Sequence, residues 1–156
     1  MDPEALEAKH AAVRMLATRA RTRQYLQERL EKRGLSADAV QTALDTLVEV
    51  GYVNDEQYAR DRVEGILGKS LQWRPALVQV LRREGIDADL AEKTVAERLA
   101  DVNQREWACE VARERLRTTN TSDTDSARRK TGAYLARCGF DTESIIAAIE
   151  EALPRI

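Results

Sequence analysis

Clustered arginine and lysine side chains are the residues of this sequence best suited to chemistry, and that chemistry is the binding of anions. Arg29 lies three residues before Lys32 and four before Arg33, so the three share one face of a helix. Arg19 and Arg21 precede that helix, at the turn that leads into it. A surface lined with such groups can contact the phosphates of a nucleic acid or an acidic groove of a partner protein. The candidate partner-binding residues are these basic clusters and one tryptophan–arginine pair: Arg23, Arg29, Arg33, Trp73, Arg74, Arg82, Arg83, Arg128, Arg129 and Lys130.

Each candidate also has a simpler structural interpretation. A single arginine is most easily explained as a solvated residue balanced by a nearby carboxylate such as Glu28 or Glu84. The combined set is harder to explain in this way, because its members lie on equivalent helices of the tandem repeat that is described below. Trp73 stands beside Arg74, just before Pro75, and a half-exposed tryptophan next to arginine is frequent in interfaces. Packing and binding roles for Trp73 therefore both stay open.

No pattern in the sequence points to catalysis. The single histidine, His10, has no neighbouring metal-ligand residues, and the two cysteines, Cys109 and Cys138, do not form a metal-binding or disulfide pattern. A glycine loop for phosphates and a nucleophile elbow are both missing. We therefore expect a non-enzymatic protein without a catalytic residue, cofactor or metal.

Composition is consistent with a helical protein of the cytoplasm. Of its 156 residues, 33% are charged and 43% hydrophobic, which is too apolar for a disordered chain. No apolar run approaches the ~20 residues of a membrane helix, and the first residues lack a secretory signal, so we expect a cytoplasmic protein that does not contact membranes. A net charge of −2 argues against a surface that is basic throughout, although local patches can still bind nucleic acid.

Three segments of similar sequence end one helix and begin the next: 30–38, 81–89 and 135–143, here called the first, second and third corners. In each corner a glycine follows the helix, where a left-handed residue closes the last turn. An apolar residue then packs back onto that turn, and serine or aspartate caps the next helix. In chain order these residues are Gly34, Leu35 and Ser36; Gly85, Ile86 and Asp87; and Gly139, Phe140 and Asp141. The regular spacing of the glycines predicts a tandem repeat.

A second signature, valine and asparagine followed four residues later by an aromatic residue, marks helix starts at 53–58 and 102–107. Asn54 and Asn103 are predicted N-caps, and Gln57 and Glu106 are the reciprocal halves of the two capping boxes. The valine before each asparagine can pack onto the aromatic residue in the first turn. Because capping and packing explain every position, these segments are interpreted as structural in preference to a binding surface.

Apolar residues recur at three- and four-residue spacing, the period of a helix. The clearest faces are Val13, Leu16, Ala17 and Ala20, and then Val40, Ala43, Leu44, Leu47 and Val48. No stretch alternates with period two. The sequence thus predicts an all-α protein of nine helices in three tandem three-helix repeats, at 4–51, 52–101 and 102–156. Since the joints between the repeats are short, we expect them to form an elongated, curved chain. The longest break between helices is predicted at 118–125.

Several of these segments resemble the RecX family of regulatory proteins. Residues 51–59 read G-Y-V-N-D-E-Q-Y-A, similar to that family's G-Y-[LIV]-[ND]-D-x-x-[FY]-A segment. Residues 22–34 resemble its basic helix S-x-x-E-L-x-x-K-L-x-x-[KR]-G. Residues 81–86 resemble its L-x-x-[KR]-G-I corner, with Glu84 in place of the usual basic residue. The resemblance covers nearly the whole chain.

The resemblance implies a function in homologous recombination, DNA repair and the SOS response. RecX proteins lie along the groove of the RecA–single-stranded DNA filament, where they typically hinder filament growth, ATP hydrolysis and strand exchange. The expected partner is therefore the RecA filament, with single-stranded DNA as a second candidate, and the expected state is a monomer. Two alternatives stay open, an autonomous DNA-binding protein with a helix-turn-helix-like module and a general helical-repeat scaffold.

Overall fold

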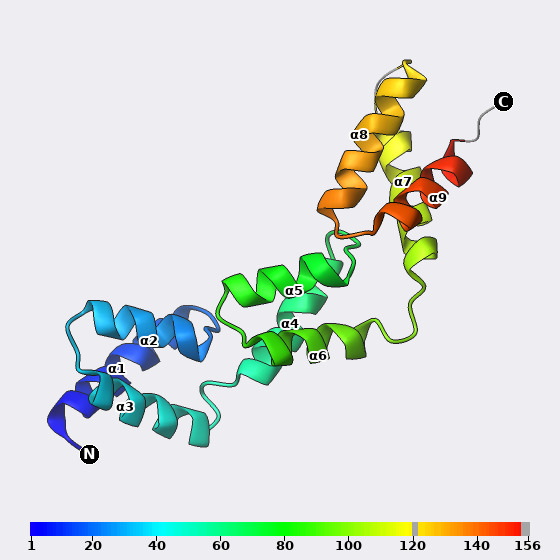
Figure 1. The fold of residues 1–156 in the computed structure, drawn as a ribbon. Coiled ribbons are helices and arrows are strands. Elements are labelled where there is room, and N and C mark those ends of the chain that lie inside the picture. The colour runs from blue at the N-terminus through cyan, green and yellow to red at the C-terminus, as the bar shows by residue number, and fades with distance from the viewer. Residues whose placement is uncertain (120–121, 154–156) are drawn as a thin grey trace. The chain divides into compact units, whose positions relative to one another are not determined.

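The computed structural model describes residues 1–119 and 122–153, and it confirms the all-α prediction. Within these ranges there are nine helices and no strand (Figure 1). The helices are α1 (Pro3–Thr18), α2 (Arg23–Lys32), α3 (Ala37–Glu49), α4 (Asp55–Leu67), α5 (Arg74–Arg83), α6 (Ala88–Arg98), α7 (Gln104–Thr118), α8 (Thr124–Arg137) and α9 (Thr142–Ala152). None of these helices is long and apolar enough to cross a membrane.

The predicted break at 118–125 separates α7 from α8, although residues 120 and 121 of that break lie outside the described residues. The last three residues of the third predicted repeat, 154–156, also lie outside them.

The chain divides into two compact units. The first comprises Met1–Arg62 and Leu81–Ala91, and the second comprises Val63–Val80 and Glu92–Ile156. Helices α1 to α3 belong wholly to the first unit and α7 to α9 to the second, while α4, α5 and α6 contribute to both. The division into three repeats, with its boundaries and its elongated, curved outline, stays a prediction from the sequence.

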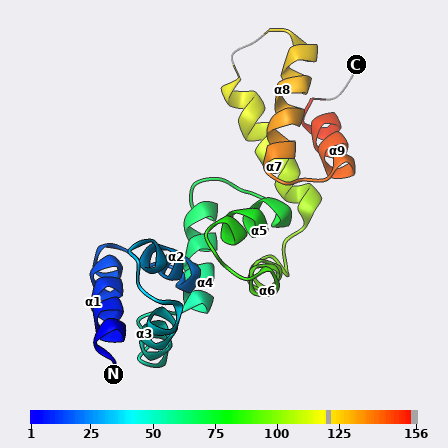
Figure 2. The same cartoon turned by 60° about the vertical axis from the view of Figure 1, so that its left-hand side comes forward.

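In the first unit, α1 lies against α3 (Figure 2). Ala8 and Ala12 of α1 are fully buried, and such small side chains let two helices approach closely. The predicted apolar face of α1 is partly wrong. Ala17 is exposed and Ala20 lies beyond the end of the helix, because the buried alanines belong to the first part of α1. Alanine occurs on several sides of this helix and favours helix wherever it stands, so its spacing does not identify the buried face.

The predicted face of α3 is mostly confirmed. Val40, Ala43, Leu44 and Leu47 are fully buried in a core that also contains Leu26 and Leu30 of α2. Val48 is the exception, with 44% of its surface exposed, because it lies one position further around the helix than Leu47.

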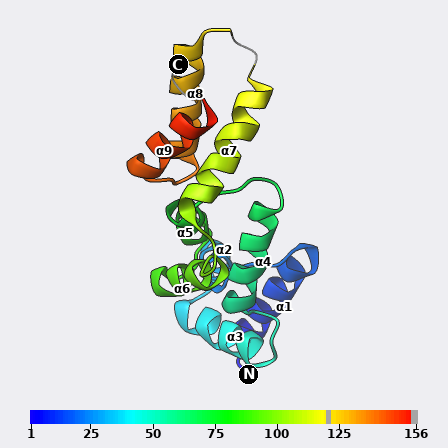
Figure 3. The same cartoon turned by 90° about the vertical axis from the view of Figure 1, so that its right-hand side faces the viewer.

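In the second unit, α7 lies against α9, and α8 packs on both (Figure 3). Aromatic rings fill part of this core. Trp73 stacks on Phe140 with 6.3 Å between ring centroids and meets Trp107 edge-on at 6.2 Å. Such pairs stabilise a core by about 0.5–1.5 kcal/mol beyond the area that they bury.

All three corners have the predicted conformation. Gly34, Gly85 and Gly139 have φ angles of +88°, +98° and +93°. Ser36 accepts a hydrogen bond from the amide of Ala39, at 3.3 Å, and the aspartates of the other corners cap α6 and α9 in the same way. At 53–58 and 102–107, the caps by Asn54 and Asn103 are confirmed as well. The reciprocal half of the capping box is not formed at Gln57, whose side chain bonds Asp61 and Arg60 of the next turn.

Two of the corners contact the beginning of another helix. At the second corner, the hydroxyl of Thr22, the N-cap of α2, donates to the carbonyl oxygen of Glu84 at 2.7 Å. At the third corner, the backbone N–H of Trp73, just before α5, donates to the carbonyl oxygen of Cys138 at 2.8 Å. In both cases the acceptor is the residue immediately before the corner glycine. The end of one helix thus meets the start of another, which aligns the dipoles of the two helices favourably.

Candidate partner-binding site: an arginine pocket

The candidate site lies in the first unit, where the second corner contacts the start of α2. Thr22 is 1% exposed, and its oxygen accepts from the amide of Tyr25 at 3.1 Å while its proton goes to the carbonyl of Glu84. Gly85 fits so closely that an added Cβ would lie 2.8 Å from Thr22 Oγ1 and 2.9 Å from Gln24 Cβ. Glycine is therefore required here both for its left-handed backbone and for its size.

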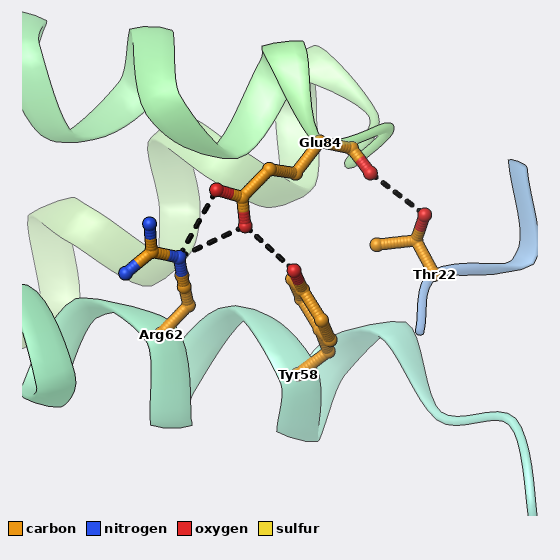
Figure 4. Close-up of polar contacts among 4 residues, drawn as sticks. All are labelled: Thr22, Tyr58, Arg62 and Glu84. Atoms are coloured by element: carbon orange, nitrogen blue, oxygen red, sulfur yellow. Dashed lines mark hydrogen bonds and ion pairs between the residues drawn. The ribbon is translucent and has the colours of Figure 1, made fainter. Parts of the chain in front are cut away.

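The side chain of Glu84 holds the second corner to α4 (Figure 4). Its carboxylate accepts from the Tyr58 hydroxyl at 2.6 Å and from Arg62 Nε at 2.9 and 3.0 Å. Burial by itself would raise the pKa of Glu84, but the hydrogen bonds from Arg62 and Tyr58 outweigh it and lower that pKa below its ordinary value. Burial and the bond to Glu84 raise the pKa of Tyr58. The acidic residue that replaces the RecX-type basic residue is thus an ionised structural anchor.

A pocket of about 250 Å³ opens beside this contact. Its walls come from the α1–α2 loop, the first turns of α2, the start of α4 and the second corner. The lining residues, here called the arginine pocket, are Arg19, Arg21, Thr22, Gln24, Tyr25, Glu28, Tyr58, Arg83, Glu84 and Gly85.

The three arginines of the pocket are available to an anion. Within the described part of the chain, none of Arg19, Arg21 and Arg83 forms an ion pair. The guanidinium of Arg21 lies 4.4 Å from the centroid of the Tyr25 ring, an arrangement that fixes a cation without neutralising it. The Nε of Arg21 is buried and without a hydrogen-bond partner. These groups can bind a phosphate or a carboxylate, since guanidinium matches the planar geometry of both.

Among the predicted site residues of the first unit, only Arg83 lines the arginine pocket. Arg29 is exposed on α2 and contacts the pocket indirectly, because its guanidinium lies 5.1 Å from the centroid of the Tyr25 ring. Arg33 ends α2 and is exposed, and Arg82 is exposed at the end of α5. Arg23 has a structural role, since its side chain bonds Asp45 at 2.7 Å and Gln41 at 2.6 Å.

In the second unit, Trp73, for which packing and binding roles were both open, is buried. Only 9% of its surface is exposed, because its ring is packed between Trp107 and Phe140. Arg74 lies over Trp73 at 5.3 Å and donates to the carbonyl of Leu99. The structure therefore gives Trp73 a packing role.

The three consecutive basic residues of α8 differ from one another. Arg128 pairs with Glu150 at 3.2 Å and donates to the carbonyl of Leu153. Arg129 and Lys130 are exposed on the same helix.

Sequence reasoning missed most of the arginine pocket. It noticed Arg19 and Arg21 at the turn before α2 but selected Arg23 from that group. Tyr25 and Glu84 gave no signal as site residues, because the contact between the α1–α2 loop and the second corner joins residues 62 positions apart. No cluster of three or more potential metal ligands occurs in the described ranges.

Comparisons with known proteins identify relatives that match most of the chain. A family model described as "RecX, first three-helix domain" matches residues 8–47. A protein of Mycobacterium sp. (strain JLS) named "Regulatory protein RecX" is 34% identical over 147 residues, which cover 89% of this chain and 78% of that protein. A protein of the same name from Syntrophotalea carbinolica is 32% identical over 136 residues, with 86% and 88% covered.

Two solved structures share the fold. The crystal structure of RecX from Lactobacillus salivarius aligns with a TM-score of 0.79 and 21% identity, and it covers 96% of each chain. A structure titled "Crystal structure of regulatory protein RecX" aligns with a TM-score of 0.78 and 18% identity, over 94% of this chain and 73% of that one.

Proposed function

The chain belongs to the RecX family of regulatory proteins, and from this premise we propose that it binds the RecA recombinase filament on single-stranded DNA and inhibits its ATPase and strand-exchange activities. RecA is the partner that the family resemblance implies. In this proposal the protein acts in the cytoplasm as a monomer, by binding and without catalysis or a cofactor. Its relatives are named as regulators, which supports a role of this kind.

The arginine pocket is the main structural support for this proposal, and it indicates which residues would contact the filament. A filament of recombinase and DNA presents phosphates and acidic side chains. To meet them, the pocket offers three guanidinium groups that form no ion pair with a described residue. The exposed residues Arg29 and Arg82 extend this basic surface within the same unit. The remaining exposed candidates, Arg33, Arg129 and Lys130, are proposed as further contacts.

The proposed mechanism is steric and electrostatic. ATP hydrolysis in a filament requires conformational change between neighbouring subunits, and a bound protein that favours one arrangement biases that equilibrium. The bias equals the difference between its affinities for the two arrangements. A binding protein can therefore slow ATP turnover without contacting the nucleotide.

The first test is to measure RecA ATPase activity on single-stranded DNA while this protein is titrated in. We expect a dose-dependent fall that saturates, followed by a matching loss of strand exchange. Unchanged assembly, turnover and strand exchange at saturating concentrations of folded protein would refute the proposal.

Variants then test the site. Arg83→Glu and Arg21→Glu each place a negative charge in the arginine pocket, and we expect each to raise the concentration needed for half-maximal inhibition by about tenfold, as loss of one charged contact implies. Arg14→Glu is the matched control, because Arg14 is exposed on α1 of the same unit, lies outside the pocket and forms no ion pair with a described residue. If all three variants raised this concentration equally, inhibition would depend on the net charge of the protein and not on the arginine pocket.

A second titration, of this protein with duplex DNA alone at two salt concentrations, distinguishes the proposed function from the helix-turn-helix-like alternative. Tight, sequence-dependent binding to DNA without recombinase would instead support an autonomous DNA-binding function. Weak binding that falls steeply with salt is the expected result, since it reflects phosphate contacts only.

A further inference from the structure

Large apolar side chains are exposed where α3 ends. Val48, Val50 and Tyr52 lie within five consecutive residues, and they are three of the six large hydrophobic side chains that the described part of the chain exposes. Val48 also forms part of the wall of a groove of about 490 Å³, together with Val53 and Leu90. An exposed apolar cluster of this kind is typical of a surface that binds another protein.

Carboxylates lie beside these apolar side chains. From residue 37 to residue 57 the chain carries five acidic residues and no lysine or arginine. Asp55 and Glu56 line the groove, and neither forms an ion pair with a described residue. Burial raises the pKa of Asp55, whose carboxylate accepts from the backbone N–H of Arg23 at 3.0 Å. Arg23 is the base that lines the groove, and its guanidinium is already paired with Asp45. This acidic face, as it is called here, comprises Val48, Glu49, Val50, Tyr52, Asp55 and Glu56.

An exposed face of α8 has the opposite charge. One side of α8 packs on α7 and α9 and buries Ala127, Thr131 and Leu135. The opposite side is exposed along two turns, because its residues recur at the spacing of the helix. Alanines form the middle of this side and bases stand at both ends. The residues of this basic face, as it is called here, are Arg129, Lys130, Ala133, Ala136 and Arg137.

The bases of this face are not neutralised by carboxylates of their own unit. Arg129, Lys130 and Arg137 form no ion pair with a described residue. Helix α8 contains one acidic residue, Asp125, against four bases. The three carboxylates of the neighbouring helix α9 are each paired with an arginine: Glu143 with Arg105, Glu150 with Arg128 and Glu151 with Arg113.

We propose that the acidic face of one copy of this protein binds the basic face of a second copy, so that copies join head to tail. Charge complementarity argues for this occupant, because the chain itself carries the basic surface that its acidic face matches. The shapes match as well, since valine and tyrosine side chains fit over a stripe of alanines. Small side chains let α1 approach α3 in the same way, at Ala8 and Ala12. Glu49 and Glu56 then pair with the bases at the ends of the stripe.

The contact is heterologous, because its two faces differ, and each added copy leaves one face of each kind free. A single helix face buries too little area for a stable oligomer, so the free protein stays the monomer of the proposed function. Copies that lie side by side on a filament are at high local concentration, where a weak contact becomes effective. The contact rests on the proposed function for this last step and makes filament binding cooperative. It also directs Arg129 and Lys130 to a neighbouring copy.

Reversal of charge tests each face separately. Glu49→Lys combined with Glu56→Lys makes the acidic face basic, and Ala136→Glu combined with Arg137→Glu makes the basic face acidic at one end. All four residues are exposed, so the fold should tolerate these changes, and thermal unfolding verifies it. An equal mixture of the two double variants is the decisive sample, because the new lysines of one variant meet the new glutamates of the other.

The matched control is Glu7→Lys combined with Glu31→Lys. Both residues are exposed in the first unit, lie outside the acidic face and form no ion pair with a described residue. The control changes the net charge as much as the acidic-face variant does. A general effect of charge on filament binding therefore appears in both proteins.

The measurement is the binding of fluorescently labelled protein to the RecA–single-stranded DNA filament as its concentration is raised. We expect a sigmoidal curve for the unsubstituted protein and for the control, because bound copies favour their neighbours. Each double variant of a face should instead bind hyperbolically and require about tenfold more protein for half-saturation. The mixture of the two should recover the sigmoidal curve.

Three results would overturn the contact between copies while the proposed function stands. Hyperbolic binding by every protein would mean that copies bind independently. Weak binding by each face variant without recovery in the mixture would mean that the faces contact the filament and not each other. Loss of the sigmoidal curve in the control as well would mean that overall charge, and not the acidic face, governs binding.

Failure of the unsubstituted protein to bind the filament would overturn the proposed function, and sedimentation of the free protein then decides the contact. The conditions are high protein concentration and low salt, under which exposed charges attract most strongly. Association that disappears in each face variant and returns in their mixture would support head-to-tail contact. A monomer in every sample would overturn it.

Discussion

Gly34 and Gly85 make a natural pair for measuring how much one helix–helix contact contributes to stability. Both lie in the first unit just after the end of a helix, and both have a left-handed backbone, with φ of +88° and +98°. They differ in their surroundings, since only Gly85 is enclosed, by Thr22 and Gln24. Replacing each glycine with alanine therefore adds the same methyl group at the same backbone conformation, once in open space and once inside a contact.

The magnitudes follow from these geometries. A left-handed alanine costs about 1–2 kcal/mol, and this cost applies to both variants. At Gly85 the methyl group would also lie 2.8 Å from Thr22 Oγ1 and 2.9 Å from Gln24 Cβ, distances that require the α1–α2 loop to move. Overpacking of this kind costs about 1–3 kcal/mol more. Movement of the loop also weakens the bond from Thr22 to the Glu84 carbonyl. We therefore expect Gly34→Ala to destabilise the protein by about 1–2 kcal/mol and Gly85→Ala by about 2–5 kcal/mol.

Urea unfolding followed by circular dichroism measures the difference, as a shift of the midpoint at constant slope. Thr22→Val serves as a check, because it removes the hydroxyl that caps α2 and bonds Glu84 while keeping the volume. We expect it to cost about 1–2 kcal/mol. Equal destabilisation by Gly34→Ala and Gly85→Ala would refute the reasoning, since it would mean that the second corner and the α1–α2 loop are not in close contact.

Three further predictions concern buried groups. Glu84→Gln should lower stability more at pH 7 than at pH 3, as urea midpoints at the two pH values would reveal. The pKa of Glu84 is lowered in the fold, so its contribution to stability is present above the ordinary value of 4.5 and declines as the pH falls toward the lowered pKa. Trp73→Ala should cost about 3–5 kcal/mol in unfolding free energy and raise the exposure of the remaining tryptophan to a fluorescence quencher, whereas a purely surface role predicts almost no loss of stability. Burial raises the pKa of both Cys109 and Cys138, so both should react with a thiol reagent at pH 8 more than about tenfold more slowly in the folded protein than in urea, and fast reaction without urea would contradict their burial.

The elements that sequence predicted well are those that depend on neighbours along the chain. A left-handed glycine after a helix and a cap two residues later are local chemistry, and so the three corners could be located from residues such as Gly34 and Ser36 alone. The face of α3 was also predictable, because valine and leucine at helical spacing leave few alternatives. The face of α1 was not, since alanine at 5, 8, 11, 12, 17 and 20 is compatible with several orientations.

The candidate site was less predictable because tertiary contacts create it. Arg83 becomes a pocket residue only when the second corner lies on the α1–α2 loop, beside Arg19 and Arg21. The burial of Trp73 could not be read from the sequence for the same reason, since Phe140, which stacks on its ring, lies far along the chain. Composition and spacing locate clusters of basic residues, but they could not distinguish Arg23, which is bonded to α3, from arginines such as Arg83 that form no ion pair among the described residues.

The bond between Thr22 and Glu84 has a consequence for the order of events during synthesis. Its partners are 62 positions apart, and so the N-cap of α2 is made long before the carbonyl that accepts its proton. At about 5–20 residues per second, the ribosome adds the intervening chain in roughly 3–12 s. During this interval Thr22 and the arginines beside it are open to water or to other molecules in the cell. Arrival of the second corner then covers Thr22 and completes the arginine pocket, so the site comes into existence only when the chain has been extended past α5.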